Sequence, residues 1–183
     1  MTEGGPRGDD RSVGTAVARV EAVLGAHPEL DVRRLDRRRW LAILPGEIRQ
    51  KIPVAIEVGR RDCTLSSFLL RGPRRDAAAL HRVLLRKNLA TARVRFCLDE
   101  DDDVLLVARL PLAAVGETEL EEVLGELYAV SEGAFEALVH IGYPGVFPPL
   151  RRGTAAPPPA DKPGAEPAHP GGGGVPGILC KRV

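Results

Sequence analysis

Apolar residues recur at helical spacing in three parts of the chain. Near the N-terminus they lie three or four residues apart, at Val13, Val17, Val20 and Leu24. This spacing predicts a helix over about residues 12–25, with Ser12 as its N-cap. The same periodicity predicts a second helix over about residues 74–87 and a long third helix over about residues 118–141.

Five short runs of apolar or alternating residues predict β-strands. They are WLAIL (40–44), PVAIEV (53–58), CTLSSFLL (63–70), ARVRFCL (92–98) and VLLVARL (104–110). Consecutive strands joined by short links pair antiparallel. The order helix, three strands, helix, two strands, helix therefore predicts an α+β fold: an antiparallel five-stranded sheet with helices packed on one face.

Composition divides the chain into three parts. Ten of the sixteen prolines and eight of the twenty glycines lie at or after Pro144. Such a segment buries too little apolar surface to offset its ordering entropy, so we expect residues 148–183 to be a disordered Pro/Gly-rich tail. We expect residues 1–11 to be disordered as well. Residues 12–147 then form one domain, which is the length that a single core can support.

The apolar runs, the N-terminal residues and the cysteines together indicate the cellular compartment. The longest apolar runs fall short of the roughly 18 residues that a membrane span needs, and the first residues are too polar for a signal peptide. The three cysteines, Cys63, Cys97 and Cys180, are too far apart for a zinc site and odd in number. We therefore expect a cytoplasmic protein with reduced thiols and no membrane partner.

Charge is distributed unevenly, although the formal net charge is only +1. Residues 1–98 hold 20 Lys or Arg against 11 Asp or Glu, residues 99–143 hold 1 against 12, and residues 144–183 hold 5 against 2. Such a chain can neutralise itself within the fold or across a dimer, or it can expose one pole to a charged partner.

Five consecutive acidic residues, at positions 99–103, lie between the last two predicted strands. Asp99, Asp101 and Asp103 match positions 1, 3 and 5 of a calcium-binding loop. However, Val104 replaces the glycine at position 6, and Leu110 replaces the bidentate glutamate at position 12. We predict a solvated hairpin turn, with no metal and no cofactor.

The register of this hairpin predicts a partner-binding face. A loop of two or four residues pairs Leu98 with Leu105 and Phe96 with Val107, and it avoids placing Arg95 opposite Arg109. The opposite face would then be apolar with a basic edge, formed by Arg93, Arg95, Cys97, Leu106, Ala108 and Leu110. A second copy of the chain or a protein client could cover this face, or the tail or a helix could pack there as core.

Other candidate chemistry is weak. The arginine-rich stretch Arg33–Arg39 could bind phosphates, but aromatic residues make up only 4% of the chain and are not interleaved with it. A nucleic-acid-associated protein using this cluster therefore stays as the alternative function. The histidines are scattered, and Cys97 has no acid or base arranged near it in sequence, so we identify no catalytic residues.

Several segments together resemble the YbjN domain family over about residues 12–147. They are WLAILPGE, LLRKN, FCLDEDDDVLLVARLPL and FEALVHIGY. The resemblance implies a fold related to the type III secretion chaperones, and a role as a sensory-transduction regulator or chaperone-like adaptor that binds protein clients as a homodimer. The chain departs from the family at Asp102 and Asp103, where a turn glycine is expected, and in its Pro/Gly tail. We thus predict a non-enzymatic protein-binding module.

Overall fold

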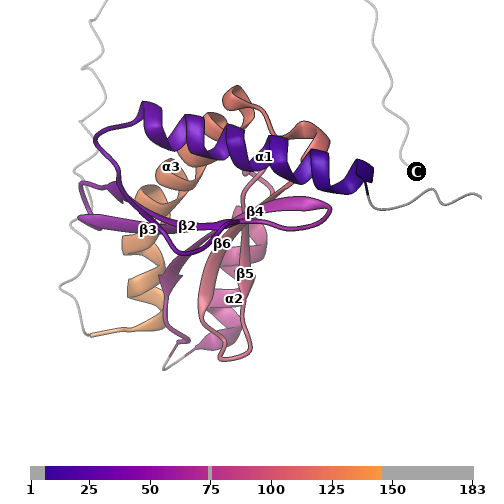
Figure 1. The fold of residues 1–183 in the computed structure, drawn as a ribbon. Helices are drawn as coiled ribbons and strands as arrows, with labels where there is room; N and C mark the ends of the chain where they lie inside the picture. Colours follow the sequence, from indigo (N-terminus) through magenta and orange to yellow (C-terminus); the bar gives the residue numbers. More distant parts are fainter. Residues whose placement is uncertain (1–6, 74–75, 146–183) are drawn as a thin grey trace, which may run out of the picture. The chain divides into compact units, whose positions relative to one another are not determined.

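A single antiparallel sheet forms the centre of the part of the chain that the structure describes, residues 7–73 and 76–145 (Figure 1). The structure is a computed structural model. The sheet has six strands in the spatial order β1-β2-β3-β4-β6-β5. They are β1 (Asp31–Arg34), β2 (Arg39–Pro45), β3 (Lys51–Val58), β4 (Asp62–Leu70), β5 (Arg95–Leu98) and β6 (Val104–Pro111).

Three α-helices pack on one face of this sheet, which confirms the predicted α+β class. They are α1 (Arg7–Ala26), α2 (Ala77–Lys87) and α3 (Glu117–Gly142), with a short 3-10 turn η1 (Leu112–Ala114) before α3. Helix α3 contacts β4 and β6, while α1 contacts α3 and β3 (Figure 1). Burial alternates along each central strand, because only the residues that point toward the helices are covered.

The sheet has one strand more than predicted, because β1 lacks the apolar or alternating pattern by which the other strands were predicted. Strand β1 contains a single apolar residue, Val32, and it lies at the edge of the sheet. Edge strands are commonly short and charged, so they lack the alternation that marks a half-buried strand. The helical boundaries differ as well: α1 begins at Arg7 rather than near residue 12. The predicted tail, residues 148–183, lies outside the described residues.

The predicted register of the last hairpin is wrong by one residue. Strand β5 pairs Phe96 with Leu106 and Leu98 with Val104, which leaves a five-residue turn over the acidic run. One Asp99 carboxylate oxygen accepts hydrogen bonds from the backbone N–H groups two and four residues further on, at 3.0 and 2.9 Å. Asp102 adopts φ 61°, a left-handed conformation that aspartate tolerates in turns. The acidic run thus builds a longer turn than the two- or four-residue loop considered.

No helix among the described residues is long and apolar enough to cross a membrane.

Candidate protein-binding site

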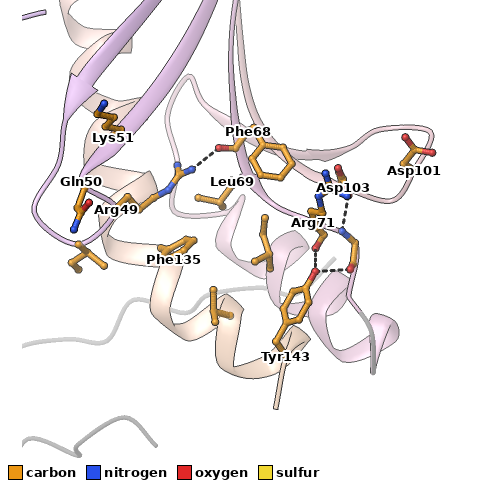
Figure 2. A pocket seen from close by; sticks show the side chains of 14 residues that line it. Arg49, Gln50, Lys51, Phe68, Leu69, Arg71, Asp101, Asp103, Phe135 and Tyr143 are labelled. Carbon is orange, nitrogen blue, oxygen red and sulfur yellow. Dashed lines mark hydrogen bonds between the residues drawn. The ribbon is translucent and has the colours of Figure 1, made fainter. Parts of the chain in front are cut away.

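A pocket of about 1170 Å³ opens where β3 and β4 separate (Figure 2). It lies between the β2–β3 turn, the end of β4, the C-terminal half of α3 and the tip of the β5–β6 hairpin. We call it the β3–β4 groove. Its apolar lining includes Ile48, Phe68, Phe135, Val139 and Tyr143. Ile48 is 46% exposed and Phe68 is 39% exposed, so the groove presents large apolar side chains to solvent.

A proline accounts for the opening. The pairing of β3 with β4 ends at Ala55 and Ser66, although each strand stays paired with its other neighbour beyond that point. Continuing the register by two residues places Pro53 opposite Phe68. Proline has no backbone N–H, so it cannot donate to the Phe68 carbonyl as a ladder partner would. The two strands are therefore free to diverge here.

Arg49 fills the place of the missing donor. Its Nη2 donates to the Phe68 carbonyl at 2.8 Å (Figure 2). Its Nη1 donates to the Ser131 hydroxyl at 2.6 Å. The guanidinium carbon lies 5.3 Å from the centre of the Phe135 ring. Desolvation lowers the pKa of Arg49, and the nearby Glu132 carboxylate opposes this in part. No carboxylate among the described residues forms an ion pair with it.

Glu132 of α3 holds the turn that carries Arg49. Its carboxylate accepts the backbone N–H groups of Glu47, Ile48 and Arg49 at 3.0, 2.7 and 3.1 Å. Desolvation raises the pKa of Glu132, but these backbone hydrogen bonds, together with the charge of Arg49, outweigh it, so that the pKa is lowered. A Cβ atom at Gly46 would lie 2.7 Å from a Glu132 oxygen, so a larger residue there would displace the carboxylate from its present position.

The other end of the groove carries two carboxylates, those of Asp101 and Asp103, and one exposed basic residue, Arg71. Asp103 accepts the backbone N–H of Gly72 at 2.7 Å, and the Tyr143 hydroxyl lies within hydrogen-bond distance of the carbonyls of Arg71 and Gly72 (Figure 2). Asp101 also lines the groove and is exposed. Part of the acidic run therefore fixes the groove wall, while Asp101 faces solvent.

The six residues predicted to form a partner-binding face do not share one face. Leu106, Ala108 and Leu110 are buried beneath the helices, whereas Arg95 and Cys97 lie on the uncovered side of the sheet. The sixth residue, Arg93, precedes β5 and pairs with Glu122 of α3 at 2.5 Å. This corrects the predicted grouping: a shift of one residue in register exchanges the two faces of β6.

The uncovered side of the sheet, which we call the open sheet face, nevertheless has an apolar centre and charged edges, on which basic residues outnumber acidic ones. One cross-strand row runs over all six strands: Arg33, Leu41, Ala55, Ser66, Val107 and Arg95. Ile43 and Leu105, beside this row, are partly exposed. Leu105 and Val107 thus lie on this face at the positions predicted for Leu106 and Ala108.

The basic cluster Arg33–Arg39 is partly engaged within the fold. Arg34 pairs with Glu21 of α1 at 2.5 Å, and its guanidinium carbon lies 5.7 Å from the Trp40 ring centre. Arg39 pairs with Asp36 at 2.6 Å. These contacts fasten the β1–β2 hairpin, and they leave fewer free cations than the sequence indicates.

Sequence reasoning missed the β3–β4 groove. Its residues come from four elements, and Arg49 and Ser131, which are in contact, are 82 positions apart. The sequence feature that could have indicated the groove is Pro53. The predicted strand begins at this proline, whereas in the structure the proline lies inside β3.

Comparisons with known proteins match the folded domain described above. A family model, YbjN, described as "Putative bacterial sensory transduction regulator", matches residues 16–139. An uncharacterized protein of Mycobacterium tuberculosis is 34% identical over 100 residues, which is 55% of each chain. One of Mycobacterium leprae is 31% identical over 105 residues, or 57% of each chain. The match thus spans little more than half the length of these relatives.

Two solved structures are also similar to the chain. The Yersinia pestis type III secretion chaperone SycH, in complex with a fragment of YscM2, is 20% identical with a TM-score of 0.43; the match covers 65% of this chain and 96% of that one. The ExsC-ExsE complex gives 19% identity and a TM-score of 0.44, with 70% and 94% covered.

Proposed function

The chain belongs to the YbjN family, and from this premise we propose that it is a non-enzymatic regulatory module that binds protein partners in the cytoplasm. The observation that carries the proposal is the β3–β4 groove. It combines exposed apolar side chains with a carbonyl, that of Phe68, whose ladder partner is missing. Extended peptides bind at such places, because main-chain hydrogen bonds supply affinity and side-chain pockets supply specificity.

The properties of the Cys63 thiol agree with a non-enzymatic role. Cys63 is buried in β4, and desolvation raises its pKa to about 12, with a smaller contribution from the charge of Asp62. A thiol with that pKa stays protonated near neutral pH, so it is a poor nucleophile.

The proposal includes a homodimer formed through the open sheet face. The centre of this face is uncharged, and its margins carry both signs, with Asp31 beside Arg33 and Glu57 in register with Arg39. A twofold axis brings the same patch of two copies together, so that basic groups of one copy can meet acidic groups of the other. A second copy would cover the partly exposed Leu41 and Val107.

Capture of partners from the native cell, followed by mass spectrometry, tests the groove. The full chain is compared with Ile48→Ser and Phe68→Ser, which remove exposed apolar groups from the groove, and with the matched control Leu85→Ser. Leu85 is 70% exposed on α2 and does not line the groove. We expect wild type and the control to retain the same partners, and both groove variants to lose them by about tenfold or more.

Any retained partner is then purified and titrated against the same four proteins by calorimetry. Equal affinity for all four would show that the groove is not the binding site and would remove the observation on which the proposal rests.

A further inference from the structure

We infer that the β3–β4 groove selects its partner by charge at both ends. It would bind an extended peptide segment whose acidic side chain lies at Arg49 and Lys51, whose basic side chain lies at Asp101, and whose middle is apolar. This inference deepens the proposed function and rests on it. Figure 2 shows Lys51 and Asp101 on opposite sides of the groove, with Arg49 on the side of Lys51 and with Phe68 and Leu69 between the two sides.

The environment of Arg49 favours an acidic side chain of the bound peptide beside it. Its guanidinium is half-buried, and its two hydrogen bonds go to uncharged oxygens, those of Phe68 and Ser131. A guanidinium has five N–H donors, so donors remain for a ligand. Moving a charge out of water is unfavourable unless an opposite charge compensates it, and Arg favours carboxylates because its fork matches their geometry. Glu132 compensates the charge of Arg49 in part, and a ligand carboxylate would add to that compensation.

Lys51 strengthens the same end of the groove. It is exposed, it lines the groove, and no ion pair within the described residues engages it. Two cations at one end raise the local concentration of anionic groups and disfavour basic ones.

At the opposite end, Asp101 and Asp103 outnumber the one basic lining residue, Arg71, and Asp101 is the carboxylate available to a ligand. The Asp99 carboxylate accepts hydrogen bonds from backbone N–H groups of the turn, and the Asp103 carboxylate accepts one from the backbone N–H of Gly72. The side chain of Asp101 has no such bond among the described contacts, although its backbone is fixed by Asp99. A basic side chain of the ligand would be attracted here, and an acidic one repelled.

The Phe68 carbonyl couples charge recognition to an extended backbone. A backbone N–H of the ligand can donate to this oxygen in place of the Arg49 Nη2 group that now does so. A segment aligned with β4 can therefore take over the bond and release Arg49 toward its carboxylate. The pocket, at about 1170 Å³, exceeds the volume typical of small-molecule sites and suits a peptide.

An array of immobilised heptapeptides with alternating apolar residues tests the inference. Each end of the peptide is Glu, Gln or Lys in all combinations, and the probe is the full-length chain. We expect peptides with Glu and Lys at their two ends, in one of the two possible orders, to bind about tenfold better than their Gln counterparts, as charge-assisted hydrogen bonds would provide. Reversing the two end residues should abolish the gain.

Three variants assign the charges. Arg49→Gln and Lys51→Gln should each reduce the preference for Glu over Gln by several-fold, and Asp101→Asn should reduce the preference for Lys over Gln. Arg60→Gln is the control, because Arg60 is exposed in the β3–β4 loop and does not line the groove. Lys51 and Asp101 are exposed as well, so these two variants test the inference even if Arg49→Gln fails to fold.

The outcomes are distinguishable. Binding of apolar peptides without any preference for charge would overturn the inference and leave the proposed function standing. Failure of wild type to bind any peptide would overturn both. If a peptide of this chain's own residues 175–183 bound better than all others, without need of Arg49 or Lys51, the occupant would be the chain's C-terminal segment and the inference would be wrong.

Discussion

Two buried serines differ in what their hydroxyl groups contact. Ser131 accepts a hydrogen bond from Arg49, whereas the Ser67 hydroxyl is buried without a hydrogen-bond partner among the described residues. Burying an unpaired hydroxyl is unfavourable, and removing the partner of a buried charged donor is unfavourable too. The same Ser→Ala change should therefore have different effects at the two positions.

We expect Ser67→Ala to leave the free energy of unfolding unchanged or to raise it by up to about 1 kcal/mol, and Ser131→Ala to lower it by about 1 to 2 kcal/mol. Urea denaturation followed by circular dichroism measures both, with each variant serving as the control for the other. Equal losses at the two positions would mean that the Ser67 hydroxyl also has a partner that it needs.

Glu132 should make stability depend on pH, because its carboxylate binds three backbone N–H groups. Its pKa is lowered in the folded state, so the contribution is fully present above the unfolded pKa of about 4.5 and disappears as pH falls through the lower folded value. Glu132→Ala should lower the free energy of unfolding by about 1 to 3 kcal/mol at pH 7.

The difference in stability between wild type and Glu132→Ala should shrink as pH is lowered from 7 to 3, measured by urea denaturation at each pH. Glu136→Ala is the control, because Glu136 is exposed one turn further along α3 and holds no backbone N–H group in the described structure. A difference that stayed constant with pH would show that the carboxylate charge does not act at this turn.

At the scale of the elements, Pro53 decides where the sheet opens. Replacing it by valine restores a backbone N–H opposite the Phe68 carbonyl, so we expect the β3–β4 ladder to extend and Arg49 to be displaced. A gained hydrogen bond of about 1 kcal/mol is offset by the greater freedom of valine in the unfolded chain, so stability should change little.

The informative measurement for Pro53→Val is hydrogen exchange of the new amide together with peptide binding. We expect slow exchange at position 53 and weaker binding in the groove. Ala55→Val is the matched control, since Ala55 already pairs with Ser66 and should leave both readouts unchanged. A rapidly exchanging amide at position 53 would indicate that something other than the proline separates the strands.

Some features of these elements could be predicted from the sequence, and others could not. The stripe along α3 and the alternation in β6 were found because each is periodic within one segment and one face is buried. The register of β5 with β6 was not found, since Asp99 builds a five-residue turn through hydrogen bonds that composition does not reveal. The groove was not found because Pro53 lies inside β3, which begins at Lys51, and its effect depends on the neighbouring strand.

At the scale of the whole domain, the uneven charge of the sequence becomes a difference between two surfaces. Helix α3 carries exposed Glu117, Glu121 and Glu122 on the helical side of the sheet. Arginines, among them Arg33 and Arg95, edge the open sheet face on the other side. A charged partner would therefore meet the domain in a preferred orientation, and this electrostatic preference should weaken as salt is added.

The open sheet face also predicts the state of assembly. Light scattering on a chromatographed sample at high micromolar concentration should give twice the chain mass of 19.7 kDa. Val107→Glu places a charge in the apolar centre of that face and should give a monomer, because an unpaired charge buried between two copies is strongly unfavourable. Leu85→Glu, on α2, should remain dimeric. A monomeric wild type, or a dimeric Val107→Glu, would rule out this face as the dimer interface.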